Sequence, residues 1–372
     1  MRTPYASGIA AVLSSLTLTV VAGIGAVAAE TSLPAYYPQD YDEIVEASRK
    51  EEGLLIYSNM AEYNWAPVIE GFNELYPWIE VQTLDLGSAE VFTRYNVEAG
   101  SDARTADLLA TGSIEGWMNF ISSGAVMDYQ SAEASKVPGW SNPSPGVYTV
   151  STDPMVLVYN KLTVPEADWP NSLGDLAALA ESQPDSYRGT LTTYNGLSPF
   201  GEPIHWEWLR HRGDEGWAEF AQYGPLTVPE ESAGTMISKL SSGEYKIGYF
   251  LSGIVVFPKT EGAAGRLLGW SFPTDGTPLV MRSVAIPEKS TSVNSARLML
   301  DFIVSRAGQA AFGEGGLTPY RPDVEASDKV KHTYGSIVKA VGEDNVVLVD
   351  YDDAFLKGKP SFEKRWKEIV GD

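Results

Sequence analysis

Residues 53–59 read GLLIYSN and residues 106–113 read ADLLATGS, and these two stretches decide the fold class. In each of them a short apolar run ends in a turn of small polar residues, which is typical of a buried strand. Segments with the pattern of helices follow both runs, over residues 59–76 and 114–123. Strands that alternate with helices in this way predict an α/β fold with a largely parallel sheet.

The same alternation extends outward along the chain. An amphipathic helix is predicted over Tyr41–Glu52, and a strand-like stretch over Val147–Tyr159 is interrupted by Asp153-Pro154. One long helix is predicted from Asn294 to Phe312. Further strands are predicted over residues 78–86, 189–193, 246–250 and 279–286, and further helices over residues 88–100, 173–182, 203–223 and 232–242.

Length and composition restrict both the architecture and the possible partners. At 372 residues the chain exceeds what one hydrophobic core usually serves, so two lobes are expected. The absence of cysteine excludes disulfides, thiolate metal sites and cysteine nucleophiles. A formal net charge of −22 disfavours nucleic acid and anionic lipid as partners, because both would be repelled.

The N-terminus has the pattern of an export signal. Arg2 precedes an apolar run over Ile9–Val27, and residues 26–29 read Ala-Val-Ala-Ala. One positive charge, an apolar stretch and an Ala-x-Ala site are typical of a secretory signal peptide, which we place at residues 1–28. The alternative is an uncleaved membrane anchor, because the run is nearly long enough to span a bilayer. No cysteine stands at the site to carry a lipid, so we expect a free periplasmic protein.

We expect the mature protein to begin at or next to Ala29, because small residues mark the cleavage site of such signals. Mass spectrometry of the periplasmic fraction measures this N-terminus directly. A full-length chain that stays in the membrane would overturn the prediction and favour the anchor.

Several stretches, in their order and spacing, resemble a known family, the extracellular solute-binding proteins of ABC importers. This family includes ferric-ion, phosphonate and sugar-phosphate binders. The likeness covers about residues 52–324 and is carried by Leu55–Ser58, Phe72–Val81, Ala106–Ala110, Val156–Lys161, Ser172–Leu176, Ser242–Tyr249 and Gly316–Asp323.

The resemblance implies the two-lobed fold of type 2 periplasmic binding proteins. Each lobe is a mostly parallel sheet flanked by helices, and crossing strands form a hinge between the lobes. Lobe 1 would comprise residues 29–152 and 282–323, lobe 2 residues 153–281, and the C-terminal helices of residues 324–372 would pack on lobe 2. The implied partners are a small-molecule solute and an inner-membrane ABC permease. We expect a monomer without cofactor, metal or catalytic activity.

The candidate ligand contacts follow the ends of predicted strands, where the ligands of α/β folds bind. Hydroxyls and free amides at helix starts can hold an anion, although simple helix capping is the alternative. A tyrosine can stack on a ligand or belong to the core, and an arginine can hold a carboxylate or phosphate or form a structural ion pair. The candidates are Ser58, Asn59, Ser88, Thr111 and Ser113 in lobe 1 and Tyr194, Ser198, Tyr249 and Arg282 in lobe 2 or at the hinge.

The sequence leaves the ligand open and favours a small anionic or polar organic solute. The ferric-ion alternative is disfavoured because the iron-binding branch has two adjacent tyrosines where this chain reads Tyr249-Phe250. Ferric iron also requires several anionic oxygens, and the lobe 1 loops supply serine, asparagine and threonine instead.

A secreted hydrolase is the alternative of another class. The histidines are His205, His211 and His332, and no His-Glu-x-x-His, Gly-x-Ser-x-Gly or phosphate-binding loop motif is present. Glu207 and His211 share a helix face, but a solvated pair explains their spacing equally well. We therefore expect saturable, stoichiometric binding and no turnover.

Overall fold

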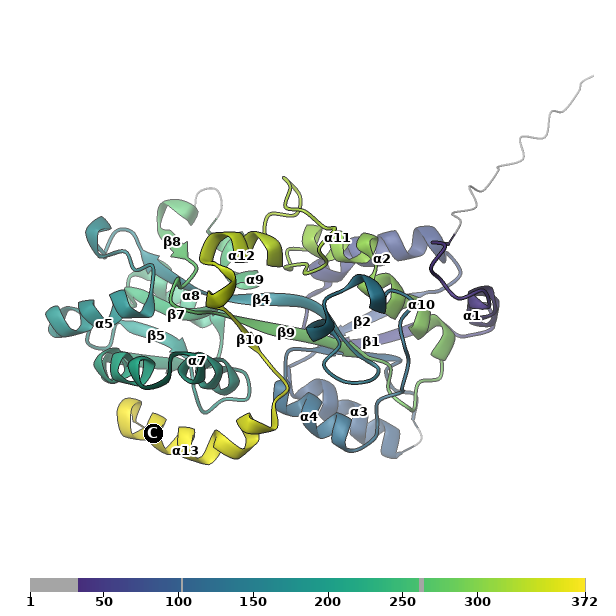
Figure 1. Ribbon diagram of the computed structural model, residues 1–372, viewed down its shortest axis with the longest axis horizontal. Helices are drawn as coiled ribbons and strands as arrows, with labels where there is room; N and C mark the ends of the chain where they lie inside the picture. Colours follow the sequence, from purple (N-terminus) through teal and green to yellow (C-terminus); the bar gives the residue numbers. More distant parts are fainter. Residues whose placement is uncertain (1–32, 102, 261–263, 372) are drawn as a thin grey trace, which may run out of the picture. The chain divides into compact units, whose positions relative to one another are not determined.

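The computed structural model describes residues 33–101, 103–260 and 264–371 (Figure 1). The predicted signal peptide lies outside the described residues. From residue 35 onward the chain forms one unit. No helix in the described ranges is long and apolar enough to cross a membrane.

The strands of the described residues form one ten-stranded sheet. Its main path runs β2-β1-β3-β9-β4-β7-β5-β6, while β10 pairs with β9 and β8 pairs with β4. The strands are β1 Leu54–Ser58, β2 Val81–Asp85, β3 Leu108–Thr111, β4 Val147–Asn160, β5 Leu191–Tyr194, β6 Thr227–Glu230, β7 Ile247–Ser252, β8 Leu268–Ser271, β9 Thr277–Ala285 and β10 Val346–Val349.

Two parallel groups of strands are joined by an antiparallel pair. β1 is parallel to β2 and β3, and β5 is parallel to β6 and β7. Between these groups, β4 pairs with β9 over Val147–Pro154 and with β7 over Met155–Tyr159. Figure 1 shows β4 and β9 running side by side from one group to the other. The predicted α/β fold with crossing strands is thereby confirmed.

Along the chain, α1 precedes the first strand and the other helices lie between and after the strands (Figure 1). They are α1 Tyr41–Ser48, α2 Glu62–Leu75, α3 Glu90–Gly100, α4 Ile114–Ser122, α5 Leu173–Ser182, α6 Pro184–Tyr187, α7 Gly201–Tyr223, α8 Ala233–Ser242, α9 Gly253–Lys259, α10 Val293–Val304, α11 Arg306–Glu314, α12 Tyr334–Val341 and α13 Asp353–Val370.

The hydrophobic clusters follow the two predicted lobes for the most part, although Ile114 of α4 belongs to the lobe 2 cluster and Ile254 of α9 to the lobe 1 cluster. In lobe 1, side chains of α2, α10 and α11 pack with those of β1 and β3, and Trp65 and Phe72 are fully buried there. In lobe 2, residues of β4, β5, β7 and α7 form a core that includes Trp208 and, from α13, Trp366. The predicted lobe boundaries fall inside β4 and β9, where Thr152 pairs with Met281. Both lobes therefore share the two crossing strands.

Two details of the predicted elements are wrong. Pro154 does not interrupt the strand. β4 pairs with β9 up to Pro154 and with β7 from Met155 onward. The backbone N–H that proline lacks is therefore not needed for a continuous ladder of hydrogen bonds to one partner strand. The predicted helix of residues 294–312 is two helices, α10 and α11. Ser305 separates them, since its backbone is extended and its hydroxyl accepts a hydrogen bond from Gly308 N at 3.1 Å.

Candidate functional site

The carboxyl ends of the parallel strands bring short polar loops to the crossing strands. β1 ends at Ser58 and β3 at Thr111 in lobe 1, whereas β5 ends at Tyr194 and β7 at Ser252 in lobe 2. In open α/β sheets, ligands bind beyond such strand ends. The candidate site is therefore the region in which these four ends face β4 and β9.

Four of the predicted site residues form one hydrogen-bonded cluster. Asn59 Nδ2 donates to Ser88 Oγ at 2.8 Å, and Thr111 Oγ1 donates to the Ser88 carbonyl at 3.0 Å. Arg282 Nη1 donates to Asn59 Oδ1, and the same nitrogen lies 3.4 Å from the Asn59 carbonyl. Ser113 begins α4 directly beside this cluster, and its amide donates to Thr111 Oγ1 at 3.3 Å.

Arg282 is the charged centre of the cluster. Its side chain lies in β9 and is 7% exposed, and its Nη2 is 3.8 Å from Asp153 Oδ2 on β4. Burial lowers the pKa of Arg282, although a guanidinium stays charged over the physiological range. Arg282 Nε has no hydrogen-bond partner among the described residues. A buried guanidinium with an unused N–H is suited to receive an anion.

Asp153 opposes Arg282 and is itself well held. Its Oδ2 accepts from Ser252 Oγ at 2.6 Å, and its Oδ1 accepts from Ile254 N at 3.3 Å. Complete burial raises the pKa of Asp153, whereas Arg282 and these donors act in the opposite direction. From the sequence, Asp153 was predicted only to interrupt a strand. A carboxylate inside an apolar strand was the available signal, because buried acids are rare unless they are paired.

Other predicted contacts have hydroxyls that are engaged within one lobe. Ser58 Oγ accepts from Trp65 Nε1 at 2.9 Å, and Ser198 Oγ donates to the Asn195 carbonyl at 2.7 Å. Tyr249 donates to Thr227 Oγ1 at 3.2 Å inside the lobe 2 core. The structure does not bring these three side chains into the Arg282 cluster.

Aromatic residues of lobe 2 stand beside the cluster. Tyr194 is buried, and its ring meets the ring of Phe200 edge to face, with 4.9 Å between centroids. Phe200 lies close to Gly112 of lobe 1. A Cβ atom placed on Gly112 would be 3.7 Å from the Phe200 ring and 3.9 Å from Arg282 Nη1. Tyr351, just before α13, packs against cores of both lobes and donates to Ser283 Oγ at 2.7 Å. Phe200 and Tyr351 were missed because single aromatics in loops carry no pattern.

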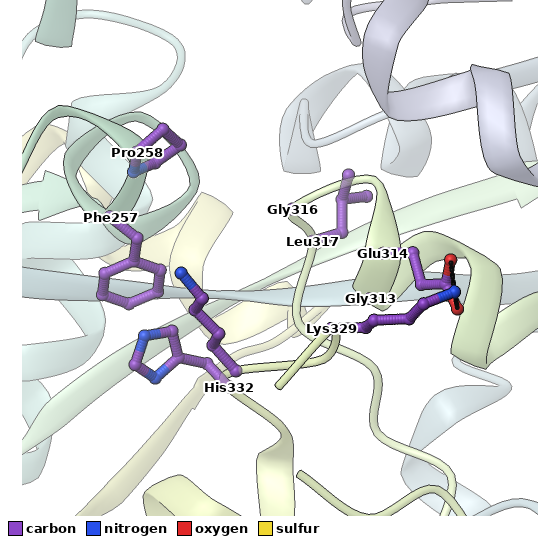
Figure 2. A pocket seen from close by; sticks show the side chains of 9 residues that line it. Phe257, Pro258, Gly313, Glu314, Gly316, Leu317, Lys329 and His332 are labelled. Atoms are coloured by element: carbon purple, nitrogen blue, oxygen red, sulfur yellow. Dashed lines mark hydrogen bonds and ion pairs between the residues drawn. The ribbon is translucent and has the colours of Figure 1, made fainter. Parts of the chain in front are cut away.

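Two pockets lie between elements of the two lobes. One, of about 420 Å³, is lined by α3 and α4, including Ser113 and Glu115, and by Pro199 of lobe 2. Figure 2 shows the other, of about 190 Å³, between α9 and α11. There the His332 ring lies 3.9 Å from that of Phe257, and Lys329 pairs with Glu314 at 3.2 Å.

The histidines and acids of the described chain do not form a metal centre. No group of three or more His, Cys, Asp or Glu side chains that could hold a metal ion occurs within the described ranges. His205 is enclosed by lobe 2, where its Nε2 lies 3.1 Å from the Tyr194 carbonyl. Burial lowers the pKa of His205 to about 3, so the ring is neutral at physiological pH.

Comparison with known proteins assigns this architecture. A family model described as bacterial extracellular solute-binding protein matches residues 68–335. The chain belongs to this family. None of the curated proteins matches the sequence of this solute-binding protein.

Solved structures of similar fold include a substrate-binding protein of an ABC transporter and a periplasmic binding protein. The solute-binding protein resembles one from an Agrobacterium tumefaciens ABC transporter, with a TM-score of 0.74, 20% identity, and coverage of 86% of this chain and 94% of that one. It also resembles iron-bound HitA of Pseudomonas aeruginosa, with a TM-score of 0.63, 17% identity, and coverage of 83% and 99%. AfuA of Actinobacillus pleuropneumoniae with fructose-6-phosphate matches with a TM-score of 0.65, 16% identity, and coverage of 86% and 98%. These matches confirm the two-lobed periplasmic-binding-protein fold.

Proposed function

We propose that this protein is the periplasmic substrate-binding component of an ABC importer and captures a small anionic or polar organic solute between its lobes. The observation that carries the proposal is Arg282, a buried guanidinium at the meeting point of both lobes whose Nε has no partner in the described part of the chain. A carboxylate or phosphate oxygen would satisfy that N–H.

The surroundings of Arg282 support an organic ligand with polar groups. Asn59, Ser88 and Thr111 supply an amide and hydroxyls from lobe 1, and Tyr194 and Phe200 supply ring surfaces from lobe 2. A planar or ring-shaped solute can use both kinds of contact. The fructose-6-phosphate bound to AfuA gives one example of an anionic solute in this fold.

Ferric iron is the second candidate because several fold neighbours bind it. The local chemistry favours the anion instead. Arg282 would repel a trivalent cation, and Tyr249 donates its hydroxyl to Thr227 in the core. The position next to Tyr249 is Phe250, which offers no oxygen.

A thermal-shift screen tests the proposal. The panel contains small carboxylates, phosphorylated sugars, neutral sugars and ferric ion, and we expect an anionic compound to raise the melting temperature most. A ligand at 100 times its Kd stabilises the folded state by about 2.7 kcal/mol. Stabilisation by ferric ion alone would restore the iron alternative, and conversion of a stabilising compound into product would favour the hydrolase.

A further inference from the structure

The C-terminal helix is anchored on lobe 2. Phe362 and Trp366 of α13 are buried in the lobe 2 core, and Trp366 stacks on Phe220 of α7 with 5.1 Å between ring centroids. At the start of α13, Asp352 accepts from Arg210 Nη1 of α7 at 2.9 Å. α13 is therefore packed onto α7 as part of lobe 2.

One lysine of this helix also reaches lobe 1. Lys359 Nζ lies 2.7 Å from Glu202 Oε2 on α7 and 2.9 Å from Glu115 Oε2 on α4. Glu115 belongs to lobe 1, whereas Glu202 is buried in lobe 2. An ammonium has three N–H donors, so Lys359 can bond both carboxylates at once. The lysine thus forms an ion pair between the lobes.

Loss of the Lys359 charge would change the electrostatics between α4 and α13. Glu363 stands 4.0 Å from Lys359 Nζ, so the ammonium lies among three carboxylates. Without the lysine, Glu115 of lobe 1 would lose its cation and face Glu363 of lobe 2. Burial raises the pKa of Glu202 to about 7, so Glu202 would add little negative charge once the lysine is gone. Repulsion between Glu115 and Glu363 would favour separation of the lobes.

The contact also stands beside the pocket that reaches Ser113. Glu115 and Ser113 line this pocket from α4, and Pro199 lines it from lobe 2. The bond from Lys359 to Glu115 therefore ties lobe 2 to a helix that lines this pocket. Opening of the lobes requires this bond to break.

We propose that Lys359 is an interlobe latch that favours, in the ligand-free protein, the lobe arrangement described here, which we call closed, over arrangements in which the Lys359–Glu115 pair is broken. The effect on capture rests on the proposed function: a closed population must open before a solute enters, so the latch sets the fraction of protein that is competent to bind. The effect on lobe separation does not depend on any ligand.

The absence of native cysteine allows a direct test in the full mature protein. Val97→Cys on α3 and Gln222→Cys on α7 place one spin label on each lobe, at exposed positions outside the latch. The distance distribution between the labels is measured without ligand. Glu115→Gln is the principal variant, because it removes the negative charge of the lobe 1 partner and leaves Lys359 paired with Glu202.

We expect Glu115→Gln to lower the ratio of closed to open molecules by about two- to fivefold, as for a partly exposed ion pair. Lys359→Met should lower it further, because the carboxylates would then repel across the gap. Lys364→Met is the matched control: this lysine is 79% exposed and pairs with Glu368 on the same helix. It should leave the distribution unchanged.

Ionic strength provides an independent readout. Added salt should open the parent protein, because it screens the Lys359–Glu115 pair, whose side chains are 27% and 39% exposed. The same salt should have little effect on the Glu115→Gln variant. Identical distributions in parent, Glu115→Gln and Lys359→Met would refute the latch. These distances are measured without ligand, so a failed search for the solute would leave this test intact.

Discussion

Replacement of Arg282 by glutamine is expected to weaken capture of an anionic solute by about thirtyfold or more. Removal of one member of a buried, hydrogen-bonded charge pair typically costs about 2–5 kcal/mol in binding, which corresponds to such a loss. The variant also leaves the Asp153 carboxylate without its cation, and that negative charge would repel the ligand. Calorimetry with the strongest anionic hit of the thermal-shift screen measures the effect.

Two further variants separate recognition from folding. Arg282→Lys keeps the charge and loses the planar fork, so we expect an intermediate affinity. Arg188→Gln removes an arginine that is 63% exposed on lobe 2 and should bind like the parent. A folded Arg282→Gln protein with the affinity of the parent would show that the solute binds elsewhere.

Replacement of Trp366 by alanine is expected to lower the free energy of unfolding by about 3–5 kcal/mol, the usual range for deletion of a buried large aromatic. The Trp366 ring lies 4.6 Å from that of His205 and stacks on Phe220, so its removal opens a cavity between α13 and α7. A Cβ on Gly196 would come within 2.5 Å of the same ring, which shows how closely it is enclosed. Chemical denaturation measures the loss.

The neighbouring Lys367 provides the control for this variant. It is exposed on the same helix, and Lys367→Ala should change stability by no more than about 0.5 kcal/mol. A loss below about 1 kcal/mol for Trp366→Ala would mean that α13 contributes little to the lobe 2 core, contrary to the packing seen here.

The alternation of strands and helices was predictable because it is encoded locally. An apolar run such as Leu54–Tyr57 indicates a buried strand, and the small polar residues after it indicate the turn that ends the strand. The same local signals placed the candidate loops at strand ends. They failed at Ser305, which caps α11 and divides a continuous helical pattern. A serine that caps a helix and a serine on the exposed side of a helix cannot be told apart by sequence pattern alone.

Local signals could not determine which candidate hydroxyls face one another. Ser58 and Asn59 are adjacent in the chain, yet Ser58 bonds Trp65 within lobe 1 while Asn59 bonds Arg282, which is 223 residues away. Tyr249 has the position expected of a ligand contact, but its hydroxyl turns to Thr227 in the core. Alternate residues of a strand point to opposite faces, and only packing decides which face meets the other lobe.

The sequence by itself determined the α/β alternation and the strand ends at which polar residues gather, since each depends on periodicity within one segment. Tertiary structure decided the pairings across the lobes. Arg282 with Asp153 and Lys359 with Glu115 are contacts between distant segments of the chain. Such pairs leave no periodic signal, because their partners are far apart in the chain and only the tertiary structure brings them together.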